Sequence, residues 1–211
     1  MTRKREGEDP AYDAARIRLG AAIRRLSHAA VRHEADMNTM DDTTDTIDSL
    51  IAHLGAHPAR SRSRDDFGFH EEHLVPDQSP MYSHIDRPGS GPGSPHGLDM
   101  TIHPRGDRVE ATFELGHSHE GAPGRSHGGF VALAFDDLMG FVLVLERVAA
   151  YTVELTVRYK APTPLLTPLV MTCWLTKRDG RKLFIEGELR ENRPDAPLIA
   201  SAAALFIAPN I

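Results

Sequence analysis

The sequence predicts an α+β fold in which a mostly antiparallel sheet surrounds one long, buried helix. Residues 130–145 are apolar on every side except for two adjacent carboxylates and one glycine. A helix that is hydrophobic all round is buried, either in a protein core or in a membrane. The segments on both sides of it alternate apolar and polar residues, which is typical of half-buried strands. Two strands, a helix and four further strands, in that order, indicate the α+β class.

The two carboxylates decide between a core helix and a membrane span. Asp136 and Asp137 lie near the middle of the apolar stretch, where an unpaired charge inside a bilayer would be costly. We therefore expect a core helix about five turns long, and no membrane span.

The residues before this helix form a candidate anion site. His127-Gly128-Gly129 opens the helix, and two glycines leave its first free N–H groups unobstructed at the positive end of the helix dipole. Such an end can bind an anion, or a carbonyl oxygen that becomes negative during a reaction.

The expected strands lie on both sides of the helix. Val153, Leu155, Val157 and Tyr159 alternate with polar residues, which places Thr152, Arg158 and Lys160 on one strand face. Asp179-Gly180 indicates a tight hairpin turn. The strand segments are 98–103 and 109–115 before the helix, and 152–160, 169–177, 181–190 and 197–207 after it.

The chain divides into three expected regions. Residues 1–60 form a charged N-terminal extension with one or two helices, 61–97 a connection rich in proline and glycine, and 98–211 the main domain. We place the helices of the extension at 11–36 and 43–55, the second capped by Asp42 or Thr43. The arginines of the first helix are interpreted as a solvated face rather than a phosphate site.

Composition limits the classes of function. The net charge of −6 argues against general nucleic-acid binding, which needs a basic face. The single cysteine, Cys173, excludes an internal disulfide and suits a reducing compartment, and the first ten residues lack the pattern of a signal peptide. We expect a cytoplasmic protein without a cofactor. His117, His119 and His127 lack a set of Cys or carboxylate partners at ligand spacing, so no metal is expected.

Several motifs occur together in the main domain. They are Glu120-Gly121-Ala122-Pro123-Gly124 leading into His127-Gly128-Gly129, Asp136 nine residues after His127, Gly140, Tyr159-Lys160-Ala161-Pro162-Thr163-Pro164-Leu165 and Gly180-Arg181-Lys182-Leu183-Phe184. On these residues, region 98–208 resembles the hotdog-fold thioesterases, in the PaaI-like branch that includes thioesterase superfamily member 4. The resemblance implies a hotdog fold, an antiparallel sheet wrapped around a long central helix, here with a helical N-terminal extension.

The resemblance also implies hydrolysis of an acyl-CoA thioester to the acid and free CoA. It implies that Asp136 is a general base or nucleophile, and that His127, Gly128 and Gly129 form the turn that polarises the thioester carbonyl. Thr152 matches a site threonine of member 4, while Arg158, Lys160, Arg181 and Lys182 fall near positions that hold CoA. Asp137 is expected instead to make a structural hydrogen bond or ion pair. Some relatives have a site asparagine where this chain has Gly121, so no role carries over to that position.

Helix geometry predicts how the site is assembled. Gly129 and Asp136 are about 10 Å apart along one helix, too far to act on one carbonyl together. We therefore expect an obligate homodimer whose two sites are shared between copies, as in the family, with a tetramer formed as a dimer of dimers left open. The alternatives are a hotdog module that binds acyl-CoA or a related ligand without turnover, and a hotdog hydratase, for which the expected Asp and His pair is missing.

Overall fold

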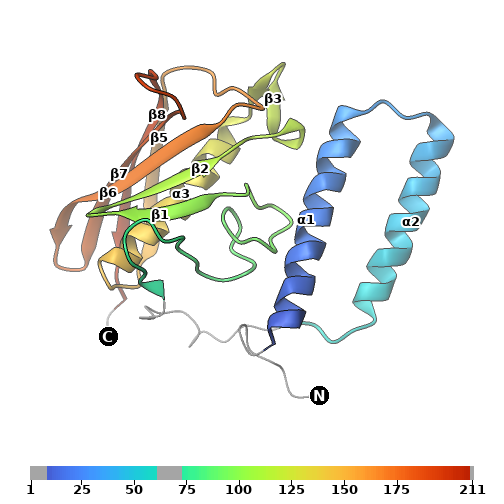
Figure 1. Ribbon diagram of the computed structural model, residues 1–211, viewed down its shortest axis with the longest axis horizontal. Helices are drawn as coiled ribbons and strands as arrows, with labels where there is room; N and C mark the ends of the chain where they lie inside the picture. Colours follow the sequence, from blue (N-terminus) through green and yellow to red (C-terminus); the bar gives the residue numbers. More distant parts are fainter. Residues whose placement is uncertain (1–8, 61–72, 210–211) are drawn as a thin grey trace.

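The computed structural model describes residues 9–60 and 73–209 (Figure 1). Two helices, α1 (Pro10–Arg32) and α2 (Met37–Gly55), precede the main domain, whose central helix is α3 (Gly128–Leu145). The strands are β1 (Thr101–Arg105), β2 (Arg108–Phe113), β3 (Glu120–Ala122), β4 (Arg125–Ser126), β5 (Tyr151–Tyr159), β6 (Leu169–Asp179), β7 (Lys182–Glu191) and β8 (Leu198–Ile207), with a short 3₁₀ helix, η3 (His117–His119).

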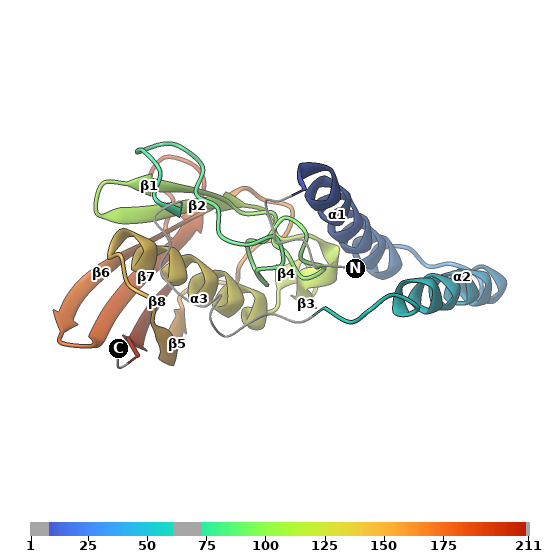
Figure 2. The same ribbon diagram turned by 90° about the horizontal axis from the view of Figure 1, so that it is seen from below.

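The main domain is the predicted hotdog fold. Its six-stranded sheet has the order β1-β2-β6-β7-β8-β5 with every neighbouring pair antiparallel, and α3 lies along one face of it (Figure 2). Phe135, Leu138 and Met139 of α3 are fully buried against the sheet. Among the described residues α3 alone has the length and apolar composition of a membrane span. The sheet buries α3, as expected for the core helix that the sequence predicts.

Several boundaries differ from the prediction. The second helix begins at Met37 rather than at residue 43, because the Asp36 carboxylate caps it by accepting a hydrogen bond from the Thr39 N–H at 2.8 Å. The first helix ends at Arg32. In the β6–β7 hairpin, Asp179 pairs with Lys182. The two-residue loop is therefore Gly180-Arg181, one residue later than expected, with Gly180 at a φ of +56°.

The connection before β1 packs on the core. Its expected span, 61–97, falls partly outside the described residues, but Met81 and Ile85 in the described part are buried. Arg87 crosses α3, where its Nε donates to the Asp137 carboxylate at 2.6 Å and its Nη2 to the Asp137 carbonyl at 2.6 Å. Asp137 thus makes the predicted structural ion pair. Gly140 leaves room for this arginine, since a Cβ there would lie 2.1 Å from Arg87 Nη2.

The extension docks through α1. Gly20 packs against the backbone of Gly93, where an added Cβ would lie 2.3 Å from the carbonyl oxygen. Arg24 is buried on the same face of the helix, pairs with the Asp99 carboxylate, and donates to the Ser94 carbonyl at 2.6 Å. These contacts fix α1 to the connection and the main domain.

Candidate active site

Asp136 and Thr152 form the polar pair of the site. Asp136 lies near the middle of α3, and Thr152 lies near the start of β5, which pairs only with β8 in the described sheet. The Thr152 hydroxyl donates to Asp136 Oδ1 at 2.9 Å. Asp136 is half-buried, whereas its neighbour Asp137 is buried. Within the described chain Oδ2 of Asp136 accepts no hydrogen bond, so it remains available to a water molecule or a substrate.

A β-bulge corrects the expected face of Thr152. The register between β5 and β8 shifts between Thr152 and Glu154, which pair with Phe206 and Leu205. The extra residue reverses the alternation at this point and turns Thr152 toward α3. The prediction that Thr152 shares a strand face with Arg158 and Lys160 is therefore wrong. Periodicity alone could not reveal the bulge, because an inserted residue leaves the alternation on each side intact.

The start of α3 is capped by the side chain of His127. Its Nδ1 accepts a hydrogen bond from the Gly129 N–H at 3.0 Å, so this donor is already engaged. The Gly128 N–H has no partner in the described part of the chain. Of the two glycine N–H groups expected to polarise a carbonyl, that of Gly128 is therefore the one available to a substrate.

Tyr159 holds the same turn from the strand side and was not predicted as a site residue. Its hydroxyl donates to the Gly128 carbonyl at 2.7 Å, and burial raises its pKa. A Cβ at Gly128 would lie 2.9 Å from this hydroxyl, which accounts for a glycine at this position. Strand alternation offered a signal, because Tyr159 follows Leu155 and Val157 on the face toward α3.

A pair of histidines links α1 to this turn. The His127 N–H donates to the His119 carbonyl at 2.8 Å, and His119 Nδ1 accepts from the Gly116 N–H at 3.0 Å. The His119 ring packs on Phe130, with 4.5 Å between centroids, and meets the edge of the His28 ring at 5.0 Å. Burial lowers the pKa of His119 to about 4, and it lowers the pKa of His28. Both rings are therefore neutral, and through them α1 of the extension supports the turn that begins α3.

The pKa of His119 predicts how stability depends on pH. Because the folded-state pKa of about 4 lies below the ordinary value of 6.5, the unfolded chain binds more protons between these pH values. The contribution of His119 to the free energy of unfolding should be complete above pH 6.5 and should decrease as the pH falls toward 4. His119→Asn retains an acceptor for the Gly116 N–H but does not titrate, so its unfolding midpoint in urea should change less across this window. An equal pH dependence in both proteins would refute the assignment.

The four basic residues expected to bind CoA do not gather in one protomer. Lys182 pairs with Ile207, which also pairs with Tyr151 at the start of β5. Arg158 lies seven residues along that strand, about 23 Å away at 3.3 Å per residue. Lys160 follows just after Arg158. Arg181 lies beside Lys182, where its Nε donates to the Ala208 carbonyl at 2.7 Å.

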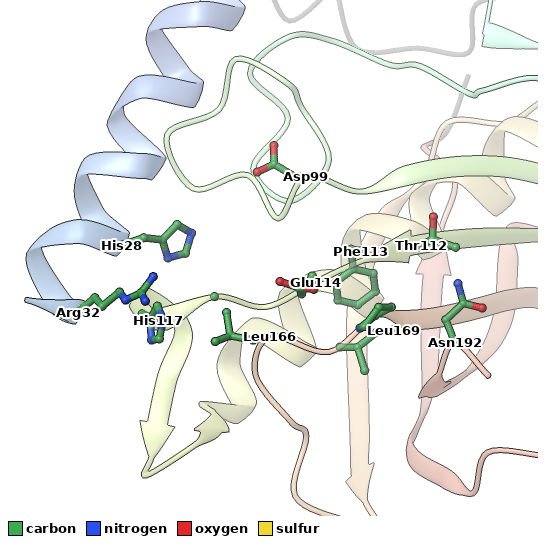
Figure 3. A pocket seen from close by; sticks show the side chains of 12 residues that line it. His28, Arg32, Asp99, Thr112, Phe113, Glu114, His117, Leu166, Leu169 and Asn192 are labelled. Atoms are coloured by element: carbon green, nitrogen blue, oxygen red, sulfur yellow. The ribbon is translucent and has the colours of Figure 1, made fainter.

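A separate cavity lies between α1 and the main domain (Figure 3). Its volume is about 660 Å³, and His28 and Arg32 of the extension form one wall. Phe113, Leu166 and Leu169 contribute from the main domain. Asp136 and Thr152 do not line it, so this cavity is distinct from the polar pair.

Comparisons with known proteins agree with this architecture. No family model matches the chain. It is 37% identical over 100 residues to the acyl-coenzyme A thioesterase THEM4 of Mus musculus and 36% identical over 100 residues to that of Xenopus laevis. Each match covers 47% of this chain, which spans less than half of those relatives, 43% and 45%. The crystal structure of a thioesterase superfamily protein, 27% identical, aligns with a TM-score of 0.75 over 91% of this chain and 90% of its own.

Proposed function

The chain belongs to the hotdog-fold thioesterase superfamily, in the THEM4-like branch, and from this premise we propose that it hydrolyses acyl-CoA thioesters to the free acid and CoA. The observation that carries the proposal is the hydrogen bond between Thr152 and Asp136 at 2.9 Å. It orients a half-buried carboxylate on the core helix and leaves its second oxygen available. The similarity to acyl-coenzyme A thioesterases extends over 100 residues of the chain.

The chemistry assigns a role to each group. Asp136 takes a proton from a water molecule, whose oxygen attacks the thioester carbonyl carbon. The Gly128 N–H, at the positive end of α3, stabilises the negative charge that develops on the carbonyl oxygen. Collapse of the intermediate breaks the C–S bond, and the proton held by Asp136 passes to the sulfur, which gives one acid and one CoA thiol. Direct attack by Asp136 on the carbonyl is the alternative route to the same products.

We infer that two copies supply these groups to one substrate. Gly128 and Asp136 lie on one continuous helix, about 12 Å apart along its axis. Strand β5 is an edge of the described sheet and exposes 57% of Val153 and 50% of Tyr159. An exposed edge with apolar side chains favours pairing with a second sheet. A twofold dimer through this side would place Asp136 of one copy near the glycine turn of the other. A fully active monomer in analytical ultracentrifugation would contradict this arrangement.

The activity can be tested by following release of the CoA thiol with a colorimetric thiol reagent. The substrates are short, medium, long and aromatic acyl-CoA thioesters, because the acyl preference depends on pocket depth. Turnover of one class supports hydrolysis and defines the substrate. Tight binding of a thioester without any turnover would instead support a hotdog module that binds acyl-CoA.

Thr152 offers a test with a matched control. Thr152→Ala removes the hydroxyl that orients Asp136, and we expect kcat to fall about 3–30-fold, since a lost hydrogen bond to a charged group is worth about 1.5–3 kcal/mol and a water molecule replaces part of it. Thr156→Ala makes the same change at an exposed position on the opposite face of β5 and should leave kcat unchanged. Equal activity of the two variants would exclude a positioning role for Thr152.

A further inference from the structure

Within residues 9–60 and 73–209, helix α2 has no partner that explains its stability. It has no buried residue and lies on the far side of α1 from the sheet (Figures 1 and 2). In proteins most of the stability of a helix comes from packing of its apolar face rather than from helix propensity. Residues 33–36 connect it to α1, but the two helices make little contact along their lengths. A further surface is therefore expected to cover α2.

Five of the six large apolar residues of α2 follow a heptad repeat, and Leu50 lies outside it. Exposed fractions along this stripe reach 71% at Met37, 61% at Ile51 and 52% at Leu54. Positions three and four apart on a helix lie on one face, and a repeat of seven is the pattern of helices that pack side by side. The stripe consists of Met37, Met40, Thr44, Ile47, Ile51 and Leu54.

Helix α1 carries a second stripe of the same period. It lies on the face opposite Gly20 and Arg24, the residues that dock the helix on the main domain. Its large side chains are exposed by 57% at Tyr12, 44% at Leu19 and 42% at Leu26. The stripe consists of Tyr12, Ala15, Leu19, Ala22, Leu26 and Ala29, and every member is exposed.

Opposite charges flank the two stripes. In heptad terms, with the stripe residues at positions a and d, α1 has arginine at three successive g positions, Arg18, Arg25 and Arg32. Helix α2 has aspartate at two successive e positions, Asp41 and Asp48. All five are exposed, and none forms an ion pair within residues 9–60 and 73–209. Charges at e and g positions select the partner and orientation of packed helices.

We propose that the α1–α2 hairpin packs against the same hairpin of a second copy to form a four-helix bundle. In parallel helices the g side of one faces the e side of the other, whereas in antiparallel helices like positions face each other. Helices α1 and α2 of one chain are antiparallel (Figure 1). Within one chain the g positions of α1, which carry arginine, therefore do not face the e positions of α2, which carry aspartate. A twofold axis perpendicular to the helices sets α1 parallel to α2 of the second copy, where they match.

A second copy fits this surface better than a membrane does. The polar side of α2 carries Asp41, Asp42, Asp45 and Asp48 and no lysine or arginine, and such a face is repelled by anionic lipid. The hairpin carries both signs of charge on separate helices, so a copy of itself provides the complement of each. This interface involves neither Asp136 nor Gly128 and is independent of the proposed hydrolysis.

The test is sedimentation velocity of the full-length chain over a range of concentrations. Leu19→Glu combined with Ile51→Glu places charges on both stripes at exposed positions, so folding of each copy is retained. We expect the mass of the assembly to halve, with association at least tenfold weaker. Ser49→Glu adds the same charge on the side of α2 opposite the stripe and should leave the mass unchanged. A wild-type monomer, an unchanged mass in the double variant, or equal dissociation by Ser49→Glu would overturn the proposal.

Charge reversal tests the orientation independently. Arg18→Glu with Arg25→Glu should weaken association, and adding Asp41→Lys and Asp48→Lys should restore it. Failure of the second pair to restore association would overturn the parallel pairing. Thiol release measured on every variant separates the two proposals, because a dissociated hairpin should leave turnover by the Asp136 site intact.

Discussion

Replacing Asp136 by asparagine is expected to lower kcat for acyl-CoA hydrolysis by about 10²–10⁴-fold, the range of general-base catalysis. The amide keeps the shape of the side chain and can still accept a hydrogen bond from Thr152, which the carboxylate accepts at 2.9 Å. It cannot accept a proton from water or attack a carbonyl. KM should change little, since the substitution removes an interaction of the transition state rather than of the bound substrate.

Glu154→Gln is the matched control for this change. It neutralises a carboxylate on the same strand as Thr152, at an exposed position on the opposite face. Its kcat should equal that of the wild type. Thiol release under saturating substrate compares the two variants directly, and comparable rates in Asp136→Asn and the wild type would remove Asp136 from the reaction.

Replacing Gly128 by proline is expected to lower kcat by about 10²–10³-fold, the effect of removing one donor to a developing oxyanion. Proline lacks the N–H but is well tolerated at the first residue of a helix. The preceding residue must be extended, and His127 already has φ −64° and ψ 134°. The helix should therefore form as before, without the donor.

Gly128→Ala isolates the loss of this N–H from the added bulk. A Cβ at this position would meet the Tyr159 hydroxyl at 2.9 Å, and both substitutions introduce it. Alanine keeps the N–H, so its kcat should lie well above that of proline. Equal losses in the two variants would assign the effect to displacement of Tyr159 and would contradict a role for the donor.

The fold was largely predictable because its main signals are local. The apolar run after Gly129 predicted α3, and the alternation around it predicted the strands of the six-stranded sheet. Asp137 was correctly assigned a structural ion pair. Its partner, Arg87, lies fifty residues away in the proline-rich connection, and no local pattern marks one arginine among many as the partner of a buried carboxylate.

The site was predictable only in part, because its details depend on tertiary contacts. The sequence and the family resemblance led to Asp136, Thr152 and the glycine turn, and the structure places the first two in contact. The bulge that turns Thr152 toward α3 leaves no mark in the alternation. Likewise, the engagement of the Gly129 N–H by His127 depends on a side-chain conformation that residue types do not determine.

Purified heterodimers of the two inactive variants test the central proposal most directly. One copy carries Asp136→Asn and the other Gly128→Pro, each with a different affinity tag. If each site combines Asp136 of one copy with Gly128 of the other, one of the two sites is intact, and thiol release should recover to about half the wild-type rate per dimer. If each copy acts alone, both sites lack one group. A heterodimer as inactive as its parents would contradict a thioesterase site shared between copies.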